Sequence, residues 1–488
     1  MITEKKLIEM FGAANVTAKQ AVLEEYSSDM SFVKETKPEY VVKVRNTEDI
    51  EKLIKLANET LTPLVPVSSG PPHFRGDTVP STGGAIIVDL SKMKKIVMVN
   101  RDNRVALFEP GVTFDELISA VTKEGLRLNI PLQPRKTKSV IGSMLEREPV
   151  IMPKYHWDIS DPLASTQVVF GTGDKFRTGA ASGPGTIKEQ WAAGGAQKEA
   201  AGPSAASWHR IIQGSQGTMG IVAWASARCE LLPKLEEPFL IGSSDLDKIM
   251  EVVHWLVRLR LVNECLILNN MNVAAVMAKK MPQEHKNLKD NLPPWILLFN
   301  IASYEYLPEE RMHGQIKDMR DVTQRIGLEA VQAINTVSAF ELLETIRHPS
   351  QDTYWKMRYK GDCYDIFFLT IYDKLPGLIE TMYSIADRAG YPASDIGIYL
   401  QPVVQGTSCH CEFNLFYNRK NPNELAQIKE LSTEAIKELM NKGAFFSRPY
   451  GENTSTIMNR DAATVETFRK VKTILDPNNI MNPGKLCF

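Results

Sequence analysis

The stretch IIQGSQGTMGIVAWASARCELLP, residues 211–233, decides which fold the chain adopts. Gly214, Gly217 and Gly220 stand three residues apart and lead directly into an apolar, strand-like run. Glycine lets a backbone approach a diphosphate closely and present its N–H groups to it. The same spacing also occurs in an ordinary glycine-rich turn before a strand. Other segments must therefore distinguish the two interpretations.

A second candidate is the loop VSSGPPHFRGD, residues 67–77. It combines residues that bend or loosen the backbone with one imidazole, His73, and one guanidinium, Arg75. Two more segments have a similar character. TKSVIGSMLE, residues 137–146, places glycine and serine after an apolar pair, and ILDPNNIMNPGKLCF, residues 474–488, closes the chain.

The totals exclude several classes of protein. The chain has 488 residues and a formal net charge of −1, so we expect no general attraction to nucleic acid or to an anionic membrane. No apolar run approaches the about 20 residues that a membrane helix needs, and residues 1–22 lack the apolar centre of a signal peptide. We therefore expect a cytoplasmic protein.

The six cysteines form no CxxC pair, which favours free thiols over a disulfide framework. No cysteine cluster suited to iron and sulfur is present in the sequence. Any iron–sulfur cluster would therefore belong to another subunit.

The order of elements predicts an α+β protein with more than one domain. Residues 40–130 mix strands and helices, and Thr113 and Glu116 have the spacing of a capping box. Residues 165–180 predict a β-hairpin, whereas 180–207, rich in Gly, Ala and Ser, predict a loop. After Pro233, strand–helix–strand units repeat, which indicates a second α+β domain built on an antiparallel sheet.

Four segments carry a resemblance to a known family. PEYVVKVRNTEDIEKLIKLANE (38–59) looks like the beginning of the family's FAD-binding domain, and residues 68–76 occupy the place of its diphosphate loop. GSQGTMGIV (214–222) is similar to its GSxGTxGI motif, and DPNNIMNPGK (476–485) to its C-terminal DPxxxxNPGK. In this order, the segments resemble the FAD-linked oxidase superfamily over nearly the whole chain.

The resemblance implies an FAD-binding domain of two subdomains, of the vanillyl-alcohol oxidase and p-cresol methylhydroxylase type, with an α+β cap domain over the flavin. We expect the FAD-binding domain at 1–233, the cap or substrate domain at 234–448 and a return to the FAD-binding domain at 449–488. The cofactor-binding residues that the resemblance implies are Ser68, Ser69, Gly70, His73, Arg75, Gly76, Gly142, Ser143, Asp161, Gly214, Gly217, Gly220, Ile221, Asn482 and Lys485.

The loop at 67–77 departs from the family's RGxGTGLSG pattern, because Pro71 and Pro72 carry no N–H donor. His73 and Arg75 would supply positive charge instead. Some family members attach the flavin covalently to a histidine of this loop, and that histidine aligns with Pro72, one residue from His73. Covalent attachment therefore stays open beside a histidine that bonds a phosphate or contacts solvent.

Asp161 aligns with the family's aspartate ahead of a VV strand, and His156 and Trp157 would border the flavin ring or the substrate. The alternative is that Asp161 caps a turn and Trp157 is a core residue.

The resemblance also implies a divalent metal, zinc, manganese or iron, in the cap domain. His410 and Glu452 match parts of the metal motifs of D-lactate- and glycolate-type members, although Val403 replaces a further histidine. Glu412, two residues along a strand from His410, points to the same face and completes the expected metal ligands. The alternative is a buried pair of histidine and glutamate.

The expected catalytic residues are His410, Glu452 and Arg358. His410 or a metal-bound water would take the hydroxyl proton, and Arg358 would bind a substrate carboxylate, unless it forms an exposed salt bridge. Asn453 and Thr454 replace the Tyr-Arg pair of the phenol-oxidising members, which disfavours a phenol substrate.

Together these features predict an FAD-dependent dehydrogenase that takes a hydride from the CH–OH group of a 2-hydroxy acid. The expected electron acceptor is a quinone, an electron-transfer flavoprotein or an iron–sulfur subunit, and the chain would form a homo- or hetero-oligomer. Two alternatives stay open, an oxidase or hydroxylase of para-substituted phenols and a catalytically silent flavoprotein subunit.

Overall fold

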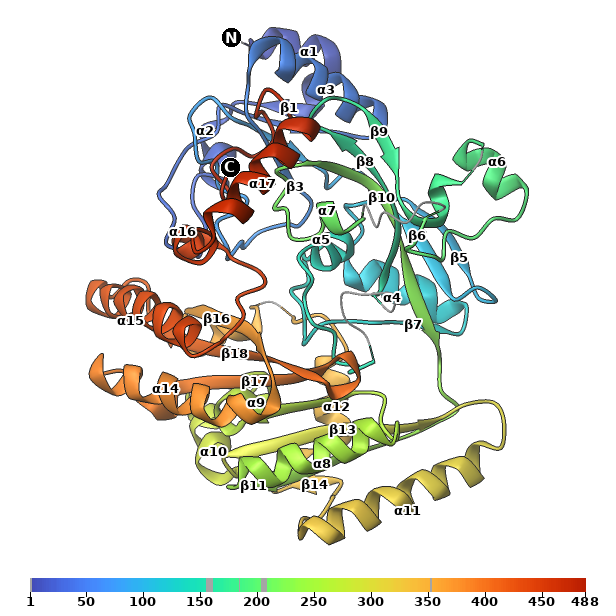
Figure 1. Ribbon diagram of the computed structural model, residues 1–488, viewed down its shortest axis with the longest axis vertical. Coiled ribbons are helices and arrows are strands. Elements are labelled where there is room, and N and C mark those ends of the chain that lie inside the picture. The colour runs from blue at the N-terminus through green and yellow to red at the C-terminus, as the bar shows by residue number, and fades with distance from the viewer. Residues whose placement is uncertain (1, 155–160, 184, 203–208, 352) are drawn as a thin grey trace.

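The computed structural model describes residues 2–154, 161–183, 185–202, 209–351 and 353–488. Figure 1 shows two lobes. One contains the N-terminal half of the chain together with the C-terminal helix α17 (Ala462–Leu475), and the other contains the strands and helices between them. No helix of the described residues is long and apolar enough to cross a lipid bilayer.

A four-stranded sheet carries the N-terminal part of the first lobe. Its strands lie in the order β1 (Val16–Thr17), β2 (Tyr40–Lys43), β4 (Ile86–Asp89) and β3 (Leu64–Val67), and β2, β4 and β3 are parallel. Helix α3 (Thr47–Thr60) connects β2 to β3 and buries Ile50, Leu53, Ile54 and Ala57, as the helical spacing predicts. Its N-cap, Asn46, accepts a hydrogen bond from Asp49 N.

A six-stranded antiparallel sheet completes this lobe. It contains β5 (Ile96–Asn100), β6 (Val105–Phe108), β10 (Gly220–Leu231), β8 (Leu163–Phe170) and β9 (Lys175–Arg177), with β7 (Leu126–Leu128) paired to β10. The predicted hairpin is β8–β9, and the predicted capping box of Thr113 and Glu116 opens α4 (Phe114–Lys123). The loop expected at 180–207 is wrong in part, because a second capping box, Thr186 with Glu189, starts helix α6 (Ile187–Ala192).

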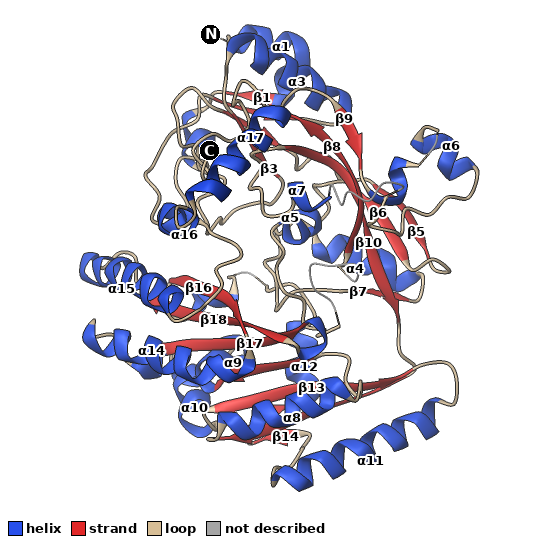
Figure 2. Ribbon diagram, viewed as in Figure 1, coloured by secondary structure: helices blue, strands red, loops and turns tan. Residues whose placement is uncertain are grey.

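The second lobe is built on one antiparallel sheet, in the order β11 (Leu235–Ser243), β13 (Trp295–Ser303), β12 (Cys265–Asn269), β17 (Ile396–Val403), β18 (Ser408–Tyr417) and β16 (Asp362–Thr370). One face packs against the apolar sides of α8 (Leu246–Arg258), α11 (Pro308–Ile326), α14 (Leu375–Arg388) and α15 (Pro422–Asn441) (Figure 2). The other face shares a continuous apolar core with α9 (Asn270–Met277), α12 (Ala339–Ile346), α13 (Trp355–Arg358) and the first lobe.

The remaining elements are short or peripheral. They are α1 (Glu4–Phe11), α2 (Gln20–Glu24), α5 (Val140–Leu145), α7 (His209–Ile212), α10 (Gln283–Asn291), β14 (Ala333–Ile334), β15 (Val337–Ser338) and α16 (Thr454–Met458).

The C-terminal segment returns to the first sheet. Leu64 N donates to Ile480 O at 2.7 Å, and Asn482 N donates to Leu64 O at 2.8 Å. The side chain of Asn482 donates to Asp77 O at 2.9 Å and to Gln216 O at 2.7 Å. The last residues therefore pair with the first residue of β3 and hold two loops that are far apart in sequence.

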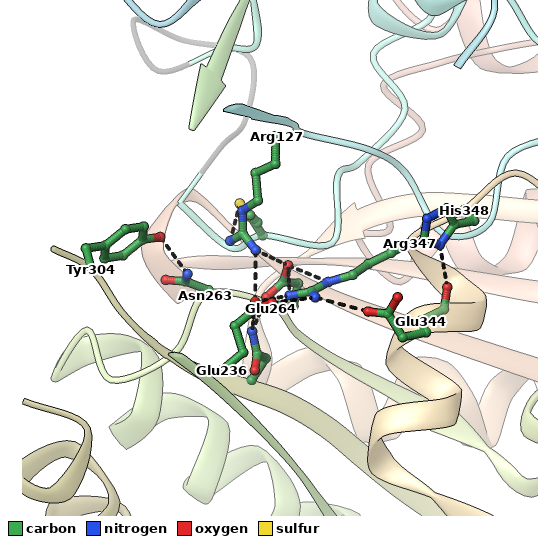
Figure 3. Close-up of polar contacts among 10 residues, drawn as sticks. Arg127, Glu236, Asn263, Glu264, Tyr304, Glu344, Arg347 and His348 are labelled. Carbon is green, nitrogen blue, oxygen red and sulfur yellow. Dashed lines mark hydrogen bonds and ion pairs between the residues drawn. The ribbon is translucent and has the colours of Figure 1, made fainter. Parts of the chain in front are cut away.

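A buried ionic cluster joins the two lobes (Figure 3). Glu264, 2% exposed and directly before β12, lies 3.0 Å from Arg127 Nη1 of β7 and 2.8 Å from Arg347 Nη2 at the end of α12. Asn300 donates to its second oxygen at 2.9 Å, and Glu236 also contacts both arginines. Burial alone would raise the pKa of Glu264, but the two guanidinium groups outweigh burial and hold this pKa below its ordinary value.

We expect Glu264→Gln to lower the free energy of unfolding by about 3 kcal/mol at neutral pH, because it leaves two largely buried guanidinium groups with less compensating charge. Because the folded-state pKa of Glu264 is depressed, its stabilisation is present above the unfolded-state pKa and is lost as the pH falls through the folded-state pKa. Urea unfolding at several pH values measures this difference. The control is Glu430→Gln on the exposed side of α15; equal effects of the two substitutions would contradict the role of the cluster.

Candidate functional site

A large cavity lies between the lobes. Its volume is about 1550 Å³, counted out to its open mouth. Three segments of the first lobe line it, namely 66–78, 131–149 and 212–222. Residues of α13, β16, β17, β18 and the segment 448–450 form the side toward the second lobe. The structure therefore brings together three of the four glycine-bearing segments that the sequence singles out, 67–77, 137–146 and the 211–233 stretch.

Two glycines let these segments approach each other. A Cβ on Gly217, whose φ is +71°, would lie 2.4 Å from Pro66 Cγ at the end of β3. A Cβ on Gly142 in α5 would lie 3.0 Å from Ser68 Oγ. Both distances are too short for a larger residue without movement of the neighbour. The wall of the cavity at this point consists of backbone and small side chains, which leaves room for a phosphate group.

The loop at 67–77 uses several of its N–H donors within the protein. Gly70 N donates to Thr137 O at 2.9 Å, and Gly76 N donates to Asp29 Oδ2 at 2.6 Å. Pro71 and Pro72 have no N–H to offer. Ser68 and Ser69 line the cavity, as do the cations Arg135 and Lys138 from the next segment. This combination of small residues and positive charge fits the diphosphate of a dinucleotide.

His73 lines the same wall and is buried. Burial, together with the positive charges of Arg135 and Lys138, lowers the pKa of His73 to about 3, so its imidazole is neutral at neutral pH. Its Nε2 has no hydrogen-bond partner among the described residues. A neutral ring nitrogen beside the cavity is compatible with covalent attachment of the flavin and with a hydrogen bond to a phosphate. Both interpretations of His73 therefore stay open.

Arg75, expected to supply charge to the cofactor, is held by two carboxylates. Its guanidinium lies 3.0 Å from Glu146 Oε2 and 3.0 Å from Glu148 Oε1. Lys138 also lies 2.6 Å from Glu146 Oε1. The charge of Arg75 is therefore largely compensated within the protein.

The other expected cofactor residues support the walls in different ways. Ser143 Oγ donates to Glu148 Oε2 at 2.6 Å, and Gly214 N donates to Leu145 O at 2.7 Å. Asp161 accepts from Leu163 N and from Gln213 Nε2, both at 2.9 Å. Gly220 and Ile221 line the cavity, whereas Asn482 and Lys485 are buried outside its lining residues. His156 and Trp157 lie outside the described residues.

An ionic group forms the part of the cavity wall contributed by the second lobe. Lys356 Nζ of α13 lies 2.6 Å from Asp365 Oδ2 of β16 and 2.5 Å from Glu412 Oε1 of β18. Asn414 donates to Asp365 Oδ1 at 2.7 Å and to Glu412 Oε1 at 2.8 Å. Burial is the main cause of the raised pKa of Asp365, and the negative charge of Glu412 adds to it while Lys356 opposes both. The group therefore contains one carboxyl that holds a proton more readily than usual.

Arg448 is a buried cation of the cavity wall for which no ion pair within 4.0 Å is found among the described residues. It is 4% exposed, and its Nη1 has no hydrogen-bond partner among the described residues. Its guanidinium lies 4.2 Å from the ring centroid of Phe367, and the guanidinium of Arg75 lies 5.0 Å from the same centroid. Burial and the charge of Arg75 lower the pKa of Arg448 to about 10, so Arg448 stays positive at neutral pH. A buried guanidinium with an unused N–H is suited to bind an anion.

Arg358, expected to bind a substrate carboxylate, lies elsewhere. It donates to the carbonyl oxygens of Ala275, Val276 and Ala278, at the C-terminal end of α9, at 2.7 to 2.8 Å. In the single turn of α13, residues two positions apart point in different directions, so Lys356 reaches the cavity and Arg358 does not. No sequence motif marks Lys356, Asp365 or Arg448, whose only signal is their charge beside strand-like segments.

The expected metal site is not supported. The described residues contain no group of three or more His, Cys, Asp or Glu side chains that could hold a metal ion. His410 Nε2 does lie 3.4 Å from Glu412 Oε2 on the same face of β18, but Glu412 is paired with Lys356. Glu452 lies 3.3 Å from Tyr364 Oη instead. Burial lowers the pKa of His410 to about 4, although Glu412 opposes this, and the ring is neutral.

The comparisons with known proteins agree with this geometry. Residues 38–179 match a family model described as FAD binding domain, and residues 240–486 match one described as FAD linked oxidases, C-terminal domain. Glycolate oxidase subunit GlcD of Bacillus subtilis is 21% identical to this chain, over 100% of this chain and 97% of the relative. The flavoprotein subunit of 4-cresol dehydrogenase [hydroxylating] from Pseudomonas putida is 21% identical, over 99% and 94%.

The structure of 4-ethylphenol oxidase from Gulosibacter chungangensis superposes with a TM-score of 0.84 at 20% identity, over 99% of this chain and 95% of that one. The structure of p-cresol methylhydroxylase gives the same TM-score at 18% identity, over 99% and 96%. The expected fold of the p-cresol methylhydroxylase type is therefore confirmed, and the first lobe contains the family's FAD binding domain. The chain belongs to the FAD-linked oxidases.

Proposed function

We propose that this FAD-linked oxidoreductase is a dehydrogenase that acts on the CH–OH group of a 2-hydroxy acid. The observation that carries the proposal is one continuous cavity, which joins the three glycine-bearing segments to the buried guanidinium of Arg448, whose Nη1 has no hydrogen-bond partner among the described residues. Arg448 would bind the substrate carboxylate, in the role first expected of Arg358. The similarity to glycolate oxidase subunit GlcD adds support at low identity.

FAD, when bound, supplies the acceptor for the hydride that leaves the hydroxyl-bearing carbon. In the proposal, Arg448 holds the carboxylate and Asp365 accepts the hydroxyl proton, so that the products are a 2-oxo acid and a protonated carboxyl. Lys356 lies between Asp365 and Glu412 and would keep the pair of carboxylates in place. His410, behind Glu412, is then a positioning residue and not a metal ligand.

The electrons would leave through a partner, a quinone, an electron-transfer flavoprotein or an iron–sulfur subunit. Two relatives are named as subunits, GlcD and the 4-cresol dehydrogenase flavoprotein, which supports a separate carrier. Within the described part of the chain, five of the six cysteines are buried free thiols, and no group of three metal-binding side chains is present.

Anaerobic mixing with D-lactate, glycolate and 4-alkylphenols tests the proposed reaction. We expect the hydroxy acids to bleach the flavin absorbance near about 450 nm and the phenols to leave it unchanged. Bleaching by the phenols alone would contradict the proposal and favour a phenol oxidase. A preparation that takes up no flavin would favour the silent subunit.

Gly142→Val is expected to lower the affinity for FAD by at least about tenfold, because the added side chain meets Ser68 at the cavity wall. The measurement is the quenching of flavin fluorescence as the apoprotein is added. The matched control is Gly314→Val on α11, where a Cβ meets no atom within 4 Å. Equal affinity of the two variants would contradict the placement of the cofactor beside α5.

Arg448→Leu is expected to weaken the binding of 2-hydroxy acids by at least about 30-fold, because a buried ionic contact is lost, and Arg448→Lys should recover part of the loss. The rate of flavin bleaching as a function of acid concentration gives the dissociation constant. Arg358→Leu is the contrasting variant, since it removes three contacts to α9 and should lower the melting temperature. If Arg358→Leu weakens the binding of the acid and Arg448→Leu does not, Arg358 and not Arg448 binds the substrate carboxylate.

The rate of bleaching is expected to rise with pH through the pKa of Asp365. Below that pKa the carboxyl is protonated and cannot accept the hydroxyl proton, and the raised pKa shifts the rise upward from the range of an exposed aspartate. Asp365→Asn should remove the rise and slow the reaction by about 10²- to 10⁴-fold. A variant that keeps the pH profile of the unaltered protein would show that another group accepts the proton.

A further inference from the structure

A second, smaller cavity adjoins the main one and is called here the side chamber. The space within it, including open solvent at its mouth, is about 580 Å³. It shares five lining residues with the main cavity, namely Phe74, Arg75, Asp365, Arg448 and Tyr450. Arg448 and Asp365 therefore border both spaces.

The side chamber is mainly apolar away from this junction. Ile366 of β16, Ile436 of α15, Phe446 and Ile457 of α16 line it. Aliphatic and aromatic side chains around a confined space favour an apolar group of a ligand. None of these residues has a part in the proposed reaction.

One end of the side chamber is polar. Glu452 lines it together with Tyr364, and Tyr364 Oη lies 3.3 Å from Glu452 Oε1. Oε2 of Glu452 is buried and has no hydrogen-bond partner among the described residues. An unpartnered carboxylate oxygen in an apolar chamber is suited to accept a hydrogen bond from a ligand.

Aromatic rings and guanidinium groups surround the junction. The guanidinium of Arg75 lies 5.0 Å from the ring centroid of Phe367 and 5.1 Å from that of Tyr450, and Arg448 lies over the same ring of Phe367. Because Arg75 is compensated by two glutamates, Arg448 is the group that attracts an anion here. A carboxylate bound to Arg448 would therefore lie beside the side chamber.

We propose that the side chamber holds the side chain of the substrate, and that this substrate is a 2-hydroxy acid with an aryl group that carries a hydrogen-bond donor at its far end, such as a hydroxyphenyl group. This inference rests on the proposed function. The carboxylate binds Arg448, the ring lies among Ile366, Phe446 and Ile457, and the distal hydroxyl donates to Glu452. The assignment gives Glu452 a binding role in place of the expected metal.

The test uses the protein with bound FAD under anaerobic conditions. The probes are both enantiomers of lactate, 3-phenyllactate and 3-(4-hydroxyphenyl)lactate, with glycolate as the smallest member. We expect the bleaching rate divided by the dissociation constant to be at least about tenfold higher for 3-(4-hydroxyphenyl)lactate than for lactate. Equal values for the short and the aryl acids would overturn the inference.

Three variants test whether the side chamber causes the preference for aryl acids. Ile457→Trp fills the side chamber and should remove the preference for the aryl acids, whereas Thr456→Trp, on the exposed side of the same helix, should leave it unchanged. Glu452→Leu should abolish the preference for the hydroxyphenyl over the phenyl compound. An aryl preference that survives Ile457→Trp, or a hydroxyphenyl preference that survives Glu452→Leu, would contradict the chamber.

A measurement without turnover separates this inference from the proposed function. 3-(4-Hydroxyphenyl)propanoate has the same carboxylate and ring but no hydroxyl to oxidise, and its binding shifts the flavin absorbance band. We expect it to bind at least about tenfold more tightly than propanoate, and Ile457→Trp to remove the difference. This result would support binding of the aryl group in the side chamber even if no hydroxy acid bleaches the flavin. Equal binding of the two acids would contradict the binding of an aryl group in the side chamber. Bleaching by lactate would still support the proposed oxidation of a 2-hydroxy acid.

Discussion

The contact between the turn of residues 214–220 and the end of β3 is the constraint on which the rest of the structure depends. Gly217 lies against Pro66 so closely that only a glycine fits without a shift. Asn482, from the end of the chain, donates to Gln216 O and to Asp77 O and so holds both loops in place. Because β10 begins at Gly220 and β11 follows directly after it, the same turn also sets the path of the chain into the second lobe.

The cations around the cavity differ in how fully carboxylates compensate their charge. Arg75 is compensated by glutamates from the first lobe, and Lys356 is compensated by carboxylates from the second. Nη1 of Arg448 has no hydrogen-bond partner in the part of the chain that the structure describes. Buried ions are costly unless they are paired, so a buried guanidinium without a full set of partners indicates that a ligand completes its contacts. Arg448 lines both the main cavity and the side chamber. In the proposal it therefore binds the carboxylate of the substrate, while the side chain of the substrate lies in the side chamber.

Motifs and hydrophobic periodicity predict the framework of the fold well. Helix α3, the hairpin β8–β9, the capping box before α4 and the antiparallel sheet of the second lobe follow from local patterns and agree with the structure. Each glycine-bearing segment can be recognised from its own short motif, and the structure brings three of these segments together at the cavity. Helix α6 was missed, since its capping box lies in a stretch whose small residues lack periodicity.

The chemistry of the second lobe could not be predicted from the sequence in the same way. His410 and Glu412 do share a face of β18, which alternation along a strand predicts. Whether Glu412 binds a metal or pairs with Lys356 depends on α13, which lies 56 residues away along the chain. Arg358 and Lys356 are two residues apart, and only the orientation of one helical turn decides which of them reaches the cavity.

Titration of the apoprotein with FAD, FMN and riboflavin by calorimetry tests most directly the claim that the three glycine-bearing segments bind a dinucleotide diphosphate. We expect FAD to bind at least about 100-fold more tightly than riboflavin, because riboflavin lacks the diphosphate that these segments are proposed to bind. FMN, with a single phosphate, should fall between the two. Equal affinities of FAD and riboflavin would contradict the placement of the diphosphate among these segments.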